Sequence, residues 1–288
     1  MLPLFHFKSH WLKRQVASLA LDAVALVRLQ QGLGQRLLEK RHANVKVNPQ
    51  SKSWTAALAE LENILGQSGD GLPITIVLSN HMVRYKIIPA LPAFSPAEKV
   101  MAVATHCFRE SYGDSVDGWL VRVNPLPHGD TLLISAVDTD LVSGIEGLCK
   151  QYRCKLTSIQ PYLMSGFNGV RRQIDTTASC FVQVEPGRLN IALIRDGSWQ
   201  SIAACTITED WSKDLSALIT REMLLAGWQN VQPKIYFSAL PSIKDEQIKQ
   251  LFKQNNPAWQ TLQVDHKSIA GYVPNQDQPY AISLSAVY

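Results

Sequence analysis

Two stretches of this chain share one pattern, in which apolar runs flank an acidic residue. The first reads Leu19-Ala-Leu-Asp-Ala-Val-Ala-Leu-Val-Arg28. The second reads Phe181-Val-Gln-Val-Glu-Pro-Gly-Arg-Leu-Asn-Ile-Ala-Leu193. Short apolar runs bounded by turn-forming residues are typical of strands. The pattern therefore predicts a strand, an acidic interruption and a second apolar run near the start of each half of the chain.

The composition indicates a globular protein with sizeable cores. The 288 residues are 46% hydrophobic and 18% charged, and 28 basic against 24 acidic side chains give a formal net charge of +4. This length suggests two domains, and the composition shows no sign of a disordered chain. The basic residues occur as separate pairs, which are typical of solvated surface and not of a nucleic-acid interface: Lys13-Arg14, Lys40-Arg41 and Arg171-Arg172.

No transmembrane segment is predicted. The longest apolar-rich run, residues 16–27, is broken by Asp22, and it is shorter than the roughly 20 residues that a bilayer requires. Residues 1–15 form a basic and aromatic arm in which we find no signal-peptide cleavage site. We therefore expect the five cysteines to be reduced thiols, and their odd number also argues against a disulfide framework.

The first half of the chain alternates predicted strands and helices. Residues 16–30 are expected to form one long strand or a tight hairpin, and residues 34–48 a strand or a helix. Ser53 and Ser95 are each expected to cap a helix, the second with Pro96 at its first position. The core stripe of that second helix is predicted to be Val100, Val103, Ala104, Cys107 and Phe108. Further strands are expected at 74–78, 82–88, 119–123, 131–137 and 155–159, and further helices at 138–152 and 162–171.

The second half repeats this alternation after an opening set of strands. Asp196-Gly197 is the strongest short hairpin signal in the chain, and it predicts a three-stranded meander over residues 180–207. A helix is expected from Asp210 or Ser212 to Ala226, followed by a strand at 234–238, a helix at 242–254, a strand at 261–264 and a strand or short helix at 280–287. This order predicts mixed α/β sheets covered by helices.

Metal and redox chemistry find little support in the spacing of the cysteines and histidines. Cys149 and Cys154 are too far apart for a Cys-x-x-Cys pair, and the adjacent His106 and Cys107 project from different faces of a helix. A free cysteine behaves as a small buried hydrophobe. We therefore assign no metal-binding residue from the sequence.

Catalytic and phosphate-binding patterns are equally weak. Ser79-Asn80-His81 reads as a polar turn between two strands. The acidic pairs Asp138/Asp140 and Glu209/Asp210 each precede a helix, where capping and the helix dipole already favour acids. Residues 31–34, with Gly32 and Gly34, lack the third glycine of a phosphate loop. We assign no catalytic and no cofactor-binding residue.

The order of elements resembles the PilM, MshI and GspL group of actin-like proteins from type IV pilus and type II secretion machines. The stretches that carry this resemblance are Met1-Leu-Pro-Leu-Phe5, Leu19-Ala-Leu-Asp22, residues 76–91, Ser95-Pro-Ala-Glu98, Leu132-Leu-Ile-Ser-Ala136 and residues 156–161. The resemblance implies an α/β protein of the actin-like ATPase fold, with two ribonuclease-H-like domains of mixed sheets flanked by helices. Residues 1–175 would form the first domain, including an inserted subdomain, and residues 176–288 the second.

Three departures from the family pattern imply a degenerate nucleotide site. Asp22 fits the acid of the first phosphate loop, but residues 23–26 supply neither glycine nor hydroxyl. The family's Asp-x-Gly-x-Thr of the second loop is matched by Glu185, Gly187 and Leu189. Residues 239–242, Ala-Leu-Pro-Ser, replace the expected Gly-Gly that contacts adenosine. A phosphate that faces Leu189 in place of a hydroxyl lacks a partner, which is costly, so no cofactor is expected.

The resemblance implies a non-catalytic scaffold or adaptor of a pilus or secretion platform at the inner membrane. Its partner would be the cytoplasmic tail of an inner-membrane protein that docks within residues 1–175, with an assembly ATPase as a further candidate. Such a protein is expected to be cytoplasmic and to reach the membrane through that partner. Two alternatives stay open: an active ATPase or sugar or nucleotide phosphotransferase of the same fold, and a helper protein unrelated to pili.

Overall fold

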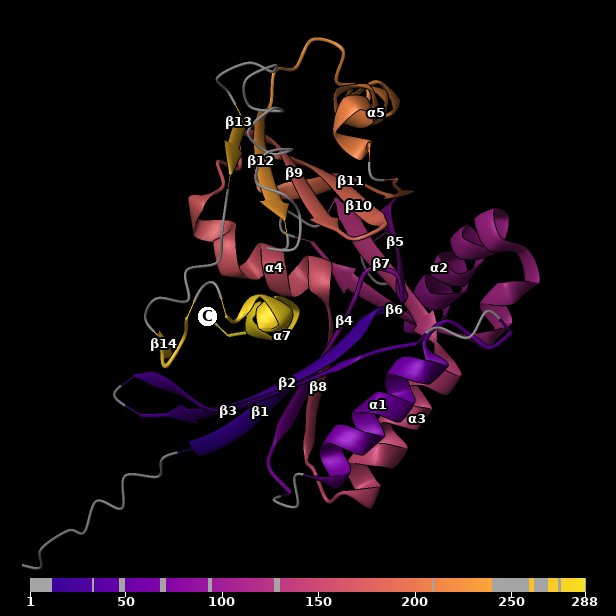
Figure 1. The fold of residues 1–288 in the computed structure, drawn as a ribbon. Coiled ribbons are helices and arrows are strands. Elements are labelled where there is room, and N and C mark those ends of the chain that lie inside the picture. The colour runs from indigo at the N-terminus through magenta and orange to yellow at the C-terminus, as the bar shows by residue number, and fades with distance from the viewer. Residues whose placement is uncertain are drawn as a thin grey trace, which may run out of the picture.

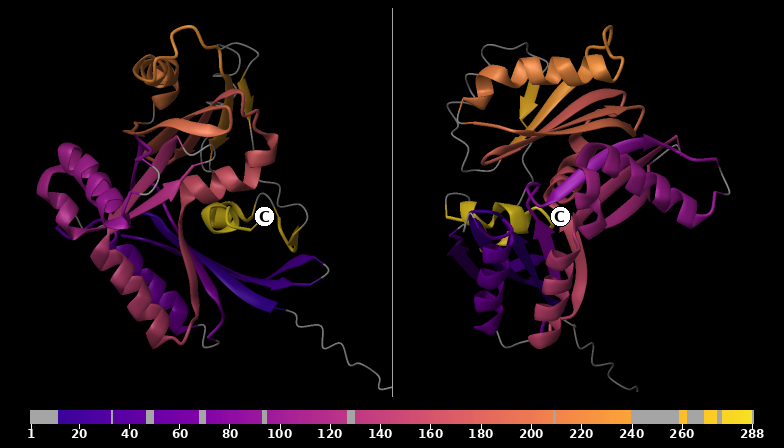
Figure 2. Two further views of the ribbon diagram at one scale, coloured as in Figure 1. Left: turned by 180° about the vertical axis from the view of Figure 1, so that it is seen from behind. Right: turned by 90° about the vertical axis from the view of Figure 1, so that its right-hand side faces the viewer.

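The computed structural model describes residues 12–32, 34–46, 50–67, 71–92, 95–126, 130–208, 210–239, 259–261, 269–273 and 276–287. These residues build three sheets with helices between and around them (Figures 1 and 2). The prediction of mixed sheets flanked by helices is confirmed.

The first sheet has the strand order β14-β3-β2-β1-β4-β8. The pairs β1–β2 and β2–β3 are antiparallel, whereas β4 and β8 extend the sheet in parallel. The bounds of its strands are β1 (Leu12–Leu19), β2 (Ala23–Gln31), β3 (Gln35–Asn44), β4 (Ile74–Leu78), β8 (Leu156–Pro161) and β14 (Ile269–Ala270). Of the two structures predicted for residues 16–30, a long strand or a hairpin, the hairpin is correct. Of the strand or helix predicted for residues 34–48, the strand is correct, and it covers residues 35–44.

Both faces of the first sheet are covered by helices, which explains why its central strands read as continuous apolar runs. Successive side chains of a strand point to opposite faces. Accordingly Leu19 packs in the core under α1 (Thr55–Gly66) and α3 (Thr139–Gln151), whereas Val16 packs under α7 (Ala281–Leu284) and the start of α4 (Tyr162–Val170). Figure 1 shows α1 and α3 on one side of this sheet and α7 on the other.

The second sheet has three antiparallel strands in the order β5-β7-β6. Its bounds are β5 (Val83–Pro89), β6 (Trp119–Pro125) and β7 (Thr131–Asp138), and α2 (Ala97–Tyr112) and the short 3₁₀ helix η1 (Gly113–Gly118) cover one face. The predicted stripe of α2 faces this sheet: Ala104 and Phe108 are buried, and Val100, Val103 and Cys107 are partly buried against them. Cys107 is therefore at the margin of the core and not inside it.

The third sheet has the order β11-β10-β9-β12-β13. Its bounds are β9 (Ala178–Glu185), β10 (Arg188–Arg195), β11 (Ser198–Thr206), β12 (Lys234–Ala239) and β13 (Trp259–Thr261). The helix α5 (Trp211–Leu225) covers the outer face, and α4 lies under the inner face, where Phe167 contacts the ring of Phe181. The meander predicted from Asp196-Gly197 is confirmed, and both residues adopt positive φ angles there, 50° and 77°.

The chain returns to the first sheet after the third. Strand β14 pairs with β3, and Ile282, Leu284 and Val287 pack against β1 and β2. Between them lies the short 3₁₀ helix η3 (Gln278–Tyr280). Residues 269–287 are part of the stretch assigned to the second domain from the sequence, but they contact the sheet of the first. The division at residue 175 itself stays a proposal.

Two predicted helix starts, at Ser53 and Ser95, are each wrong by one residue. The helix α1 begins at Thr55 with Trp54 in the capping position, and α2 begins at Ala97 with Pro96 in that position; neither shows a side-chain capping bond. Pro96 has an extended backbone with ψ of 143°, so the helical turn starts only after it. The start of α3 is confirmed, since Asp138 accepts a hydrogen bond from the backbone of Asp140. The predicted helix at 242–254 lies outside the described residues.

Candidate functional site

The turns of the two acidic hairpins face one cavity of about 750 Å³ between the first and third sheets. One wall is the β1–β2 turn at residues 20–23, and the opposite wall is the β9–β10 turn at residues 185–187. The 3₁₀ helix η3 and the start of α7 close a third side. The recurring pattern of the sequence therefore brings its two copies to a single site.

The acidic residues of the two copies occupy different positions. Asp22 lies in the β1–β2 turn and is exposed, whereas Glu185 ends β9 before its turn and is buried, with only 2% of its surface exposed. Val24 lies in the core of the first sheet and Leu189 in the core of the third, so neither side chain reaches the cavity. The hairpin residues 19–26 and 185–189 contain no Ser or Thr. Of the predicted adenosine-loop replacement at 239–242, only Ala239 is among the described residues.

A buried hydrogen-bond network ties Glu185 to the first half of the molecule. The Ser79 hydroxyl donates to Oε2 of Glu185 at 2.7 Å, and the backbone N–H of Asn80 donates to Oε1 at 2.9 Å. Burial raises the pKa of Glu185, while the bonds from Ser79 and Asn80 act in the opposite direction. Both carboxylate oxygens of Glu185 thus accept hydrogen bonds from the protein itself.

Asn80 is the centre of this network. Its Nδ2 donates to Oε1 of Gln183 at 2.9 Å. Its Oδ1 accepts from the Tyr85 hydroxyl at 2.9 Å and from the backbone N–H of Leu163 at 3.0 Å. All of these groups are buried, and burial raises the pKa of Tyr85 well above its usual value. One amide thereby joins β5, β9 and the first turn of α4.

His81 completes the connection at the rim of the cavity. Its Nε2 lies 2.8 Å from the carbonyl oxygen of Pro186 in the opposite turn. Gly187, next in that turn, has a φ of +73°, and a Cβ there would stand 3.4 Å from Cε1 of His81. The sequence predicts only a polar turn for residues 79–81, because no spacing rule connects them to a hairpin some hundred residues later.

The C-terminal segment 269–287 fixes the remaining side of the cavity to the first sheet. The Ser283 hydroxyl donates to the Ser18 hydroxyl at 2.8 Å and lies 3.1 Å from the carbonyl oxygen of Ala25. Lys40 forms an ion pair of 2.6 Å with Asp277, whose side chain is fully buried. A buried, paired carboxylate costs several kcal/mol when its partner is removed, so this segment is firmly anchored.

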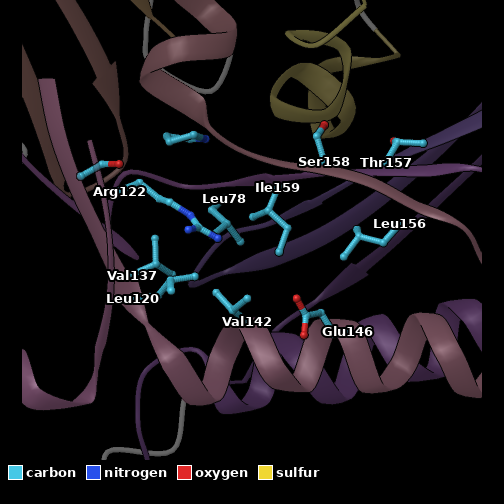
Figure 3. Close-up of a pocket in the computed structure, with 12 residues that line it drawn as sticks. Leu78, Leu120, Arg122, Val137, Val142, Glu146, Leu156, Thr157, Ser158 and Ile159 are labelled. Carbon is cyan, nitrogen blue, oxygen red and sulfur yellow. The ribbon is translucent and has the colours of Figure 1, made fainter. Parts of the chain in front are cut away.

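A separate groove of about 330 Å³ lies between β8, the second sheet and α3 (Figure 3). Strands β8 and β6 are each at an edge of their sheet among the described strands, and both line this groove. Its lining is mostly apolar, with Arg122 extending from β6 and Glu146 from α3. Both of these charged side chains are exposed.

The thiols and titratable groups show no metal-site arrangement. Among the described residues no three His, Cys, Asp or Glu side chains come together. Cys149 is buried, and burial raises the pKa of its thiol to about 11. Cys154 accepts a hydrogen bond from Nε2 of Gln15 at 3.3 Å. In the described part of the chain, no helix is both long and apolar enough to cross a bilayer.

Neither a protein-family profile nor a curated protein sequence matches this chain. Several solved structures, by contrast, superpose on it. The PilM–PilN type IV pilus biogenesis complex contains a chain that superposes with a TM-score of 0.67 at 13% identity, over 95% of this chain and 96% of that one. A Bacteroides thetaiotaomicron protein with an actin-like ATPase fold superposes with a TM-score of 0.56 at 11% identity, over 87% and 91%. The cytoplasmic domain of EpsL, an inner-membrane component of the Vibrio cholerae type II secretion system, gives 0.52 at 9%, over 95% of both chains. The chain therefore has the actin-like ATPase fold.

Proposed function

We propose that this protein is a non-catalytic scaffold that binds the cytoplasmic tail of an inner-membrane protein in the groove between β8, β6 and α3. The support is structural likeness to PilM and to the EpsL cytoplasmic domain, which cover nearly the whole chain. The observation that carries the placement is the groove itself, because two strand edges open into one apolar channel.

An edge strand presents unpaired backbone N–H and C=O groups that an extended peptide can bind by adding a strand. Residues 156–159 of β8 and Pro161 all line the groove, so backbone as well as side chains face it. Leu120, Val137 and Val142 contribute apolar walls from three different elements. An extended tail therefore gains backbone hydrogen bonds and side-chain pockets in the same channel.

The charged residues of the groove supply direction. Arg122 and Glu146 form no ion pair or hydrogen bond within the described residues. A bound tail that carries an acidic and a basic residue at the matching spacing would pair with both. Charges of this kind select register and orientation more than they add affinity.

The large cavity between the two hairpins supports the non-catalytic part of the proposal. Glu185 is held by Ser79 and Asn80, and the hairpins offer no hydroxyl to a phosphate or its metal. These bonds join the two halves of the protein. The scaffold would be cytoplasmic and would reach the membrane through its partner.

The test uses the purified full-length protein and measures how much of it is recovered bound to detergent-solubilised inner membranes. The change is Val142→Glu, because Val142 is half-buried at the groove wall and the new carboxylate would fill the channel. The matched control is Ser143→Glu, one residue along the same helix and exposed. We expect Val142→Glu to abolish recovery and Ser143→Glu to leave it unchanged.

Equal recovery of both variants would refute the placement in the groove. Absence of recovery for the unaltered protein as well would refute the adaptor function. Separate expression of residues 1–175 and 176–288 is a poor substitute, since removal of residues 269–287 exposes apolar surface on β1 and β2.

A further inference from the structure

A small cavity of about 210 Å³ lies on the far side of His81 from the large one, because His81 lines both. Two tryptophans and two cations dominate its lining: Trp54 and Lys52 from the segment before α1, Trp119 from β6, and Arg84 from β5. Neither the proposed scaffold function nor the large cavity between the hairpins involves the other residues of this cavity.

Arg84 faces the cavity without a carboxylate partner among the described residues. One of its terminal nitrogens donates to the carbonyl oxygens of His81 at 3.0 Å and Val83 at 3.3 Å, and its guanidinium lies 5.9 Å from the ring centre of Trp119. These contacts hold the side chain in place but leave its positive charge unbalanced. A guanidinium has five N–H donors, and the second terminal nitrogen and Nε form no hydrogen bond within the described residues.

A second guanidinium, that of Arg188, lies outside the lining of this cavity. Arg188 begins β10, and β11, its neighbour in the sheet, runs alongside β5 (Figure 1). Burial and the positive charge of Arg188 both lower the pKa of Arg84. Nε of Arg188 is buried and has no hydrogen-bond partner in the described structure. The carboxylate opposite it in the hairpin, Glu185, is already bound by Ser79 and Asn80.

The remaining charges of the cavity are paired with one another. Lys52 contacts Asp138 at 3.0 Å and Asp140 at 2.8 Å, and its Nζ lies 5.5 Å from the ring centre of Trp54. Asp138 is the carboxylate that lines the cavity, and Lys52 is shared between it and Asp140. Arg84 is thus the cation of the lining that has no carboxylate partner among the described residues, and Trp54 and Trp119 line the same cavity.

We propose that this cavity binds the acidic side chain of a partner protein. Its volume suits one Glu or Asp side chain, whose methylene stem would pack against Trp54 and Trp119 while its carboxylate meets Arg84. Charge-assisted hydrogen bonds from a guanidinium to a carboxylate are about twice as strong as neutral ones. The cavity is therefore a second docking point, apart from the groove at β8.

The test uses two capped tetrapeptides, acetyl-(Glu)₄-amide and acetyl-(Gln)₄-amide, titrated into the full chain while the indole N–H signals of Trp54 and Trp119 are followed by NMR. We expect the Glu peptide to shift both signals and the Gln peptide to shift neither. Arg84→Gln should weaken Glu-peptide binding at least tenfold because it removes the cation that meets the carboxylate. Lys52→Gln should also weaken it at least tenfold, because it leaves Asp138 at the cavity without its ion pair. Arg172→Gln, at an exposed position of η2 (Arg171–Gln173), is the control and should change the affinity less than twofold.

Lys52→Gln keeps the test valid if Arg84→Gln unfolds the protein, since Lys52 lies on a loop and its side chain is 53% exposed. Equal affinity for the Glu and Gln peptides, or equal loss in the Arg172 control, overturns the proposal. Inorganic phosphate is titrated in parallel. If phosphate shifts the two indole signals and the Glu peptide does not, the site binds a free anion and the proposal of a protein partner is wrong.

Discussion

Replacement of Asn80 by alanine should strongly destabilise the protein, because this amide joins the two halves. The change removes the partners of three buried groups: Oε1 of Gln183, the Tyr85 hydroxyl and the backbone N–H of Leu163. A buried polar group left without a partner costs about 1–3 kcal/mol. The sum is roughly 3–9 kcal/mol, and water that enters the vacated space recovers part of it. We expect a loss of about 3–5 kcal/mol, a large share of the roughly 5–15 kcal/mol that stabilises a typical domain.

The assay is urea unfolding followed by circular dichroism, with thermal unfolding as a second measure. A change of 1 kcal/mol moves the Tm of a chain of this size by about 2–4 °C, so the variant should melt about 6–20 °C lower. Asn124→Ala is the control, since Asn124 is exposed on β6, and it should change stability by less than about 0.5 kcal/mol. A loss below about 1 kcal/mol for Asn80→Ala would show that the network does not hold the halves together.

Three further predictions test the site, a thiol and the backbone. Mg-ATP should raise the Tm by less than about 1 °C, whereas a ligand at a hundred times its Kd adds about 2.7 kcal/mol and roughly 5–10 °C; a shift of that size would contradict the loss of nucleotide binding. The pKa of the Cys149 thiol is raised to about 11, so at pH 7 it should react with a thiol reagent roughly a hundredfold more slowly than a thiol of pKa 9. Because only the thiolate reacts, the reaction rate should rise tenfold per pH unit up to about pH 10. Peptide mapping that shows a plateau of the rate near pH 9 would contradict this. Gly71→Ala should destabilise, because φ is +56° and a Cβ would stand 2.9 Å from the carbonyl oxygen of Arg153, whereas Gly147→Ala in α3 meets nothing within 4 Å and should stabilise by up to about 1 kcal/mol; urea unfolding that ranks the pair in the opposite order would disprove the argument.

The regular elements could be predicted from the sequence because their signals are local. Apolar runs and turn residues predict the meander at residues 180–207, whereas for residues 16–30 they leave one long strand and a hairpin open; Asp138 marks the start of α3. Ser53 and Ser95 misled for the same reason, since several residues near a helix start can cap it and only the backbone decides which one does. The choice between strand and helix for residues 280–287 needed the first sheet, whose apolar face is covered by a helical turn at 281–284.

The candidate site could be predicted only in outline. The departure of the hairpins from a phosphate-binding pattern is visible in the residues themselves, and the structure brings both hairpins to one cavity. What occupies the place of a ligand was not visible, because Ser79 and Asn80 contact Glu185 across more than a hundred residues of chain. Neither local propensity nor periodicity contains information on such a pair. The groove at β8 was likewise hidden, since it exists only where two sheets meet.

The return of residues 269–287 to the first sheet has a consequence for synthesis on the ribosome. Strands β1, β2 and β4 are complete by residue 78, yet Ile282 and Leu284, which cover one of their apolar faces, are translated about 200 residues later. At roughly 5–20 residues per second this face waits about 10–40 s for its cover. The nascent chain is therefore a natural client for a chaperone during that interval, and translation that halts before residue 282 yields a protein that the cell's proteases can recognise as unfinished.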